Sequence, residues 1–174
     1  MSSEIRRHRL AAFIARLQEP RRFLQVLEGA GMVCSLQKYA GQAVRQRGSS
    51  PKLQVFNTAL MGAIATTEGF DITRLRATPE LWGRITESAV GAELLARHLA
   101  HSSTQPLIHY WRNGPDEVDY VLRHLGELFA YEVKSGANAG NARGLDAFCK
   151  LNPGCRPLVL GTGGLPLQTW FENA

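Results

Sequence analysis

The sequence between residues 117 and 134 most constrains the fold, because it predicts a β-hairpin with charged side chains inside its strands. Two runs of mostly apolar and β-branched residues flank a short turn at 123–126. Successive side chains of a strand point to opposite faces, so Glu132 and Lys134 are expected on the same face. Pairing of the two strands can bring Asp119 within reach of Glu132. Charges in such strands need a compensating arrangement, because burying an unpaired charge is costly.

Two carboxylates and a lysine at one edge of a sheet indicate a metal-assisted chemistry. Carboxylate oxygens are hard ligands that suit Mg²⁺ or Mn²⁺. A lysine beside them can stabilise the charge of a phosphorane or orient a metal-bound water. A second interpretation stays open, because glutamate and lysine two residues apart are common on exposed strands. In that case Asp119, Glu132 and Lys134 are ordinary surface charges.

Helices and strands alternate on both sides of this hairpin, a pattern that predicts an α/β fold. Thr78-Pro79-Glu80 is a strong helix start, with a capping hydroxyl, a first-turn proline and an acid near the positive end of the helix dipole. We expect a mixed sheet flanked by helices, with the helix that starts at Pro79 on one face and a helix near Arg143 on the other. The predicted elements are helices over 79–100 and 139–150 and strands over 105–111, 117–122, 127–134, 158–160 and 167–171.

The first part of the chain, residues 1–78, is predicted to form a winged-helix-like subdomain and a linker, and residues 79–174 the main domain. Within residues 1–78, a polar and basic stretch over 37–52 lies between two short apolar strands. Residues 66–78 have the composition of a connection. A small helical and hairpin subdomain with a solvated basic loop is the alternative. The predicted elements are helices over 4–17, 21–28 and 57–65 and strands over 32–36 and 53–56.

Composition adds expectations about partners and compartment. The formal net charge of +5 favours a polyanionic partner without requiring one. The three cysteines, Cys34, Cys149 and Cys155, form no C-x-x-C pair, which indicates reduced thiols in an intracellular protein. No uncharged apolar run is long enough to cross a bilayer. We therefore expect a soluble, cytoplasmic protein without a membrane partner.

Several runs of residues together resemble a known family. They lie at 24–33, 50–60, 83–91, 110–112, 117–119 and 132–134. In this order they resemble the domain of unknown function found C-terminal to the P-loop in bacterial and archaeal AAA+-type ATPases. That domain is placed in the PD-(D/E)XK nuclease superfamily, so the resemblance implies a PD-(D/E)XK nuclease-like mixed sheet flanked by helices.

The resemblance also implies roles for four residues. Asp119 matches the acidic residue of the first nuclease motif, and Glu132 and Lys134 match its E-x-K. Glu87 matches an acid on the helix before the core sheet. Asp119, Glu132 and Glu87 would then hold Mg²⁺ or Mn²⁺, and Lys134 would complete the catalytic set. Asp116 is a rival for the role of Asp119, but it falls in the turn before the strand.

The chain departs from the family in one respect that bears on function. It contains no G-x-x-x-x-G-K-[ST] motif, so the ATPase half is expected to be absent. Two functions remain open. One is a Mg²⁺-dependent nuclease that hydrolyses phosphodiester bonds of nucleic acid, with DNA favoured. The other is a non-catalytic regulatory module that binds nucleic acid or a partner, as the remnant of an AAA+-type ATPase. The oligomeric state is not predicted.

Overall fold

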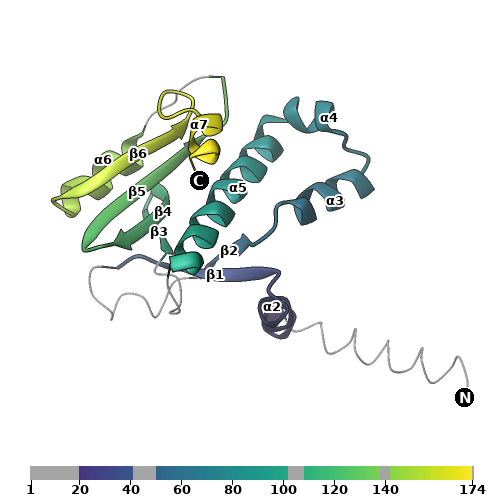
Figure 1. Cartoon of the computed structure of the whole chain (residues 1–174), viewed down its shortest axis with the longest axis horizontal. Helices are drawn as coiled ribbons and strands as arrows, with labels where there is room; N and C mark the ends of the chain where they lie inside the picture. Colours follow the sequence, from purple (N-terminus) through teal and green to yellow (C-terminus); the bar gives the residue numbers. More distant parts are fainter. Residues whose placement is uncertain (1–19, 41–49, 102–107, 138–141, 174) are drawn as a thin grey trace, which may run out of the picture.

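A six-stranded mixed sheet runs through the protein, as a computed structural model shows for residues 20–40, 50–101, 108–137 and 142–173 (Figure 1). The strand order is β2-β1-β3-β4-β5-β6. Strand pairs β1–β2, β3–β4 and β4–β5 are antiparallel, whereas β1–β3 and β5–β6 are parallel. The strands are β1 (Val33–Lys38), β2 (Lys52–Val55), β3 (Ile108–Asn113), β4 (Asp116–His124), β5 (Glu127–Lys134) and β6 (Cys155–Gly161).

Helices cover both faces of this sheet, which confirms the predicted α/β class. The long helix α5 packs on one face and α6 on the other (Figure 1). Within the described ranges, no helix is both long and apolar enough to span a lipid bilayer. The helices are α2 (Pro20–Gly29), α3 (Ala59–Thr67), α4 (Ile72–Arg76), α5 (Pro79–His101), α6 (Arg143–Leu151) and α7 (Leu167–Glu172).

Strand alternation divides the apolar side chains into two cores. On the α5 side, Tyr120 and Tyr131 pack with residues of α5 such as Leu95. On the α6 side, Val121 and Ala130 pack with residues of α6 that include Phe148. Consecutive residues along β4, and likewise along β5, therefore pack into opposite cores, as the two-residue period of a strand requires. The predicted placement of the two helices on opposite faces is confirmed.

The first part of the chain differs from its prediction. Strands β1 and β2 extend the central sheet, with Lys38 of β1 opposite Tyr110 of β3, so a winged-helix-like subdomain is not confirmed. The segment predicted as a connection, 66–78, contains the short helix α4, which packs against α5. The predicted helix over 4–17 and most of the basic stretch lie outside the described residues. The domain boundary at residue 78 stays a prediction.

The prediction of a final strand over 167–171 is wrong, because these residues form α7. Trp170 is buried from this helix against the α5-side core. Its ring lies 4.2 Å from the Arg97 guanidinium and 5.8 Å from the Tyr131 ring, and its carbonyl accepts a hydrogen bond from Arg97. These contacts come from distant parts of the chain, so tertiary packing decides the structure of a segment too short to show a clear period.

Candidate functional site

A β-bulge in β4 determines where Asp119 lies. His109 of β3 pairs with Val121 and Trp111 pairs with Val118, so both Asp119 and Tyr120 lie opposite the single residue Tyr110. A bulge bends the strand and redirects a side chain, and bulges occur often beside functional sites. Here the bulge brings Asp119 towards α5 and β2.

Asp119 lies where the regular ladder between β4 and β5 stops. The last paired residues are Tyr120 and Tyr131, and beyond them the backbone N–H of Val133 donates to Oδ2 of Asp119 at 2.8 Å. The carboxylate therefore replaces a missing backbone acceptor at the end of the ladder. Its other oxygen, Oδ1, lies 3.7 Å from Nζ of Lys52. Asp119 is thus fixed by β5 on one side and faces a cation on the other.

Lys52 joins two of the predicted site residues. Its ammonium forms an ion pair with Glu87 of α5 and also approaches Asp119, and it lies 5.1 Å from the centre of the Tyr120 ring. The side chains of all three charged residues are mostly buried, with exposed fractions of 22% for Lys52, 29% for Glu87 and 16% for Asp119. The structure therefore brings Glu87 and Asp119 together around a lysine that was not predicted as a site residue.

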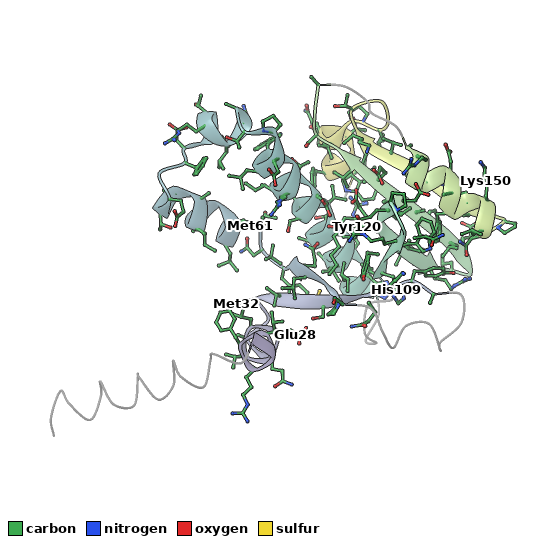
Figure 2. All side chains as sticks on the ribbon, turned by 180° about the vertical axis from the view of Figure 1, so that it is seen from behind. Glu28, Met32, Met61, His109, Tyr120 and Lys150 are labelled. Carbon is green, nitrogen blue, oxygen red and sulfur yellow. The ribbon has the colours of Figure 1, made fainter. Side chains whose placement is uncertain are left out.

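A buried amide positions β2, and with it Lys52, on α5. The Gln54 side chain is only 2% exposed and donates to the Ser88 carbonyl at 2.8 Å. The hydroxyl of Tyr120, between the sheet and α5 (Figure 2), lies 2.8 Å from Gln54 Oε1 and 2.9 Å from the Glu87 carbonyl. Gly91 makes this approach possible, because a Cβ there would lie 2.2 Å from Gln54 Oε1.

The second half of the predicted site, Glu132 and Lys134, lies on β5. Lys134 donates to Glu132 Oε1 at 2.6 Å, so the two side chains share a face, as strand alternation predicts. The other oxygen, Glu132 Oε2, is buried and has no hydrogen-bond partner among the described residues. Glu132 lines a cavity of about 340 Å³. Asp116, the rival to Asp119, borders the same cavity and accepts a hydrogen bond from Arg143 at 2.6 Å.

The charges of Glu87, Asp119 and Glu132 affect one another's pKa values. Burial, followed by the charge of Glu87, raises the pKa of Asp119 to about 7, and Glu132 acts in the same direction. Burial also raises the pKa of Glu132, although its ion pair with Lys134 opposes this. For Lys52, burial alone would lower the pKa, but Asp119 and Glu87 raise it above its usual value. Burial and the neighbouring carboxylates therefore both favour the protonated form of Asp119.

The donor set has the chemistry that a hard divalent cation requires, but it is small. Within the described part of the chain, no three His, Cys, Asp or Glu side chains form a metal-binding group. Mg²⁺ is commonly held by only one or two protein carboxylates, with water and substrate phosphates as the other ligands. Asp119 and Glu132 are carboxylates of this kind, and Glu132 Oε2 has no hydrogen-bond partner among the described residues.

The sequence did not reveal Lys52 and Gln54 as part of this site. Lys52 stands at the end of a basic stretch, where a solvated charge is the usual interpretation. Its contact with Asp119 spans 67 positions of the chain, which no local pattern indicates. A glutamine inside the short apolar run 53–56 was the available signal, because a polar residue in such a strand needs a buried partner.

Comparison with protein families places most of the second part of the chain in a known family. The family described as a domain of unknown function (DUF4143) matches residues 82–169, just over half of the chain. The chain belongs to this family. The DUF4143 region begins in α5 and ends in α7, and it includes Glu87, Asp119, Glu132 and Lys134. Lys52 and the strands β1 and β2 lie before it. No curated protein and no solved structure matches the chain.

Proposed function

We propose that this protein hydrolyses phosphodiester bonds of nucleic acid in a Mg²⁺- or Mn²⁺-dependent reaction, with DNA as the favoured substrate. The observation that carries the proposal is the buried oxygen of Glu132, which has no hydrogen-bond partner among the described residues and belongs to a residue that lines a cavity. Asp119, whose pKa is raised in part by the charge of Glu132, is the second carboxylate. Buried carboxylates are costly to keep charged, and a bound cation would offset that cost. The resemblance to the PD-(D/E)XK domain of AAA+-type ATPases supports the same reaction.

Asp119 and Glu132 are the residues that would hold the cation, with Glu87 assisting from α5. When bound, the cation supplies Lewis acidity toward a phosphoryl oxygen and lowers the pKa of a water. Val133 fixes the orientation of Asp119 through its backbone N–H, and Lys134 fixes that of Glu132. Both carboxylates are therefore oriented before any ligand arrives, which reduces the cost of reorganisation during the reaction.

Lys134 and Lys52 have different roles in this proposal. Lys134 is 23% exposed and lies beside Glu132, where its ammonium can donate to a phosphate oxygen that gains charge. Lys52 neutralises part of the charge of Glu87 and Asp119 in the protein alone. It therefore keeps these two carboxylates together without a cation.

A second candidate is a non-catalytic module that binds nucleic acid or a partner. The observation that favours it is the pairing of acids with lysines of the same chain, Glu87 with Lys52 and Glu132 with Lys134. A site whose charges are balanced internally can persist after the loss of catalysis. Fold and family do not decide between these functions, because function resides in the site.

Hydrolysis of labelled DNA in the presence of Mg²⁺ or Mn²⁺ tests the first candidate. We expect cleavage by the native chain and a loss of about 100-fold or more in Glu132→Gln and in Asp119→Asn. The matched control is Glu127→Gln, because Glu127 lies on the same strand and is also paired with a basic residue, Arg156. DNA binding without cleavage would support the second candidate. Equal cleavage by Glu132→Gln and Glu127→Gln would contradict the proposed site.

A further inference from the structure

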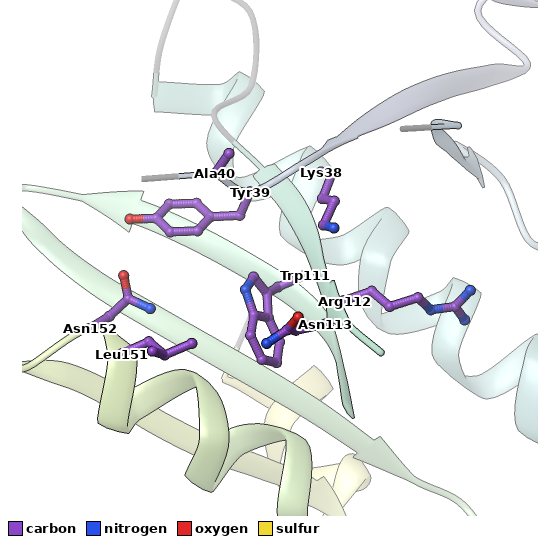
Figure 3. A pocket seen from close by; sticks show the side chains of 8 residues that line it. All are labelled: Lys38, Tyr39, Ala40, Trp111, Arg112, Asn113, Leu151 and Asn152. Atoms are coloured by element: carbon purple, nitrogen blue, oxygen red, sulfur yellow. The ribbon is translucent and has the colours of Figure 1, made fainter. Parts of the chain in front are cut away.

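A second cavity lies at the end of the sheet, where β1, β3 and α6 all terminate (Figure 3). Its volume is about 300 Å³, near the lower limit of ligand-binding pockets and suited to a ligand the size of a nucleobase. None of its residues belongs to the site formed by Glu87, Asp119, Glu132 and Lys134, which we call the carboxylate site. The side chains that matter here are Lys38, Tyr39, Trp111, Arg112, Asn113 and Asn152.

Two aromatic side chains form the apolar wall of this cavity. Tyr39 and Trp111 each pack edge-on against Phe148, with ring centres 5.4 Å and 5.3 Å apart. Trp111 is only 7% exposed, whereas Tyr39 is partly exposed, and both line the cavity. Because the same buried Phe148 supports both rings, the aromatic wall is held in place before a ligand binds.

Polar and basic groups complete the cavity in a pattern that suits a nucleotide. Figure 3 shows Tyr39, Trp111 and Asn152 directed toward a common space, with the Arg112 guanidinium extending away from the rings. Asn152 donates through Nδ2 to the Phe148 carbonyl, which leaves its amide oxygen as an acceptor. Amides can bond the edge of a base, aromatic rings stack on its face, and cations contact its phosphates.

The Arg112–Glu117 ion pair connects this cavity to the carboxylate site. Arg112 lines the aromatic cavity, and Glu117 lines the other cavity together with Glu132. The two residues are paired across β3 and β4, next to the turn that joins these strands. A chain of nucleotides that follows this hairpin end would pass from the aromatic cavity to the carboxylates.

We propose that the aromatic cavity binds one unstacked base of single-stranded DNA, and so makes a single strand the preferred substrate of the proposed nuclease, on which this inference rests. Tyr39 stacks on the base, Asn113 and Asn152 bond its edge, and Lys38 and Arg112 contact the flanking phosphates. A base in a duplex must first be unpaired and unstacked, which costs binding free energy. A single strand presents that base without this cost.

The stacking part of the inference is tested by fluorescence anisotropy with labelled oligothymidylate in EDTA. The same full-length chain is titrated with an abasic oligonucleotide of equal length, which keeps the phosphates and lacks the bases. We expect about tenfold weaker binding of the abasic strand, and weaker binding of a duplex as well. Equal affinity for thymidylate and abasic strands would overturn the inference.

Variants locate the binding site on the surface. Lys38→Gln and Arg112→Gln should each weaken binding several-fold and reduce its salt dependence by about one phosphate contact. Arg156→Gln is the matched control, because Arg156 is 60% exposed and paired with Glu127, much as Arg112 is 59% exposed and paired with Glu117. An equal loss in Arg112→Gln and Arg156→Gln would indicate diffuse electrostatic attraction and overturn the inference. Tyr39→Leu should reduce thymidylate binding, and if it does not fold, the abasic comparison still decides.

Binding in EDTA and cleavage in Mg²⁺ report separately on the aromatic cavity and on the nuclease. Selective thymidylate binding in EDTA, without cleavage after Mg²⁺ is added, supports the aromatic cavity and contradicts the nuclease. Mg²⁺-dependent cleavage with equal binding of thymidylate and abasic strands supports the nuclease and overturns the cavity.

Discussion

We expect the free energy of unfolding of the protein without metal to depend on pH through Asp119. Its pKa is raised from 3.8 to about 7, first by burial and then by Glu87. Between these values the folded protein retains a proton that the unfolded chain has released, so the contribution of Asp119 to stability is present at low pH and is lost as pH rises towards 7. Lys52, Glu87 and Glu132 surround this carboxylate.

Asp119→Asn isolates this effect, because the surrounding charged groups remain in both proteins. We expect the free energy of unfolding of the variant, relative to the native chain, to increase by about 2 kcal/mol between about pH 5 and pH 7.5. Denaturant unfolding in EDTA at both pH values measures it. The asparagine oxygen can still accept from Val133, so the end of the strand ladder is kept. A difference that does not change with pH would show that Asp119 titrates normally.

The close contact between α5 and the sheet depends on Gly91, so a larger residue there should lower the stability of the fold. Gly91 of α5 faces Gln54 and Tyr120, and a Cβ there would lie 2.4 Å from the Tyr120 hydroxyl. We expect Gly91→Ala to lower the free energy of unfolding by about 1–3 kcal/mol, because the buried hydrogen bonds must move apart. Gly83 lies on the same helix, and its added Cβ would meet Ser135 Oγ at an ordinary 3.5 Å.

Gly83→Ala is therefore the control for helix propensity. Alanine favours a helix over glycine, so this variant should be unchanged or more stable by up to about 1 kcal/mol. Chemical denaturation of both variants measures the contrast. If both substitutions change stability by the same amount, the close approach of β2 and β4 to α5 does not contribute as we describe.

The elements that sequence reasoning predicted correctly are those whose signals are local. The start of α5 follows from Pro79 and Glu80, and the hairpin of β4 and β5 follows from apolar runs on either side of a turn. Glu132 and Lys134 share a face because they are two positions apart on one strand. The bulge at Asp119 has no such signal, since it depends on the register between β3 and β4.

Long-range pairing explains what the sequence could not predict. β1 is parallel to β3, and the described residues between them include β2 and the helices α3, α4 and α5, so no hairpin pattern connects them. The place of Lys52 in the site depends on that pairing, because β1 lies between β2 and β3 in the sheet. The helix α7 was similarly missed, since it depends on the packing of Trp170 against Arg97 and Tyr131.

At the scale of the whole molecule, the first strands and the DUF4143 region share one sheet. Leu36 of β1 is buried in the same core as residues of α5, and Tyr110 of β3 donates to the Ser50 carbonyl at 2.6 Å. We expect a chain of residues 79–174 alone to lose cooperative unfolding or to melt well below the full chain, because β3 would lose its neighbour and Tyr120 its Gln54 partner. Calorimetry of both chains measures this. Equal melting temperatures would instead support the domain boundary at residue 78.

Thermal unfolding with and without Mg²⁺ or Mn²⁺ tests whether Asp119 and Glu132 together hold a divalent cation. A ligand that binds only the folded state raises the melting temperature by mass action. We predict a metal-dependent rise for the native chain and for Glu127→Gln, and no rise for Asp119→Ala or Glu132→Ala. A native chain that does not respond to metal, or alanine variants that respond as the native chain does, would contradict this role of the two carboxylates.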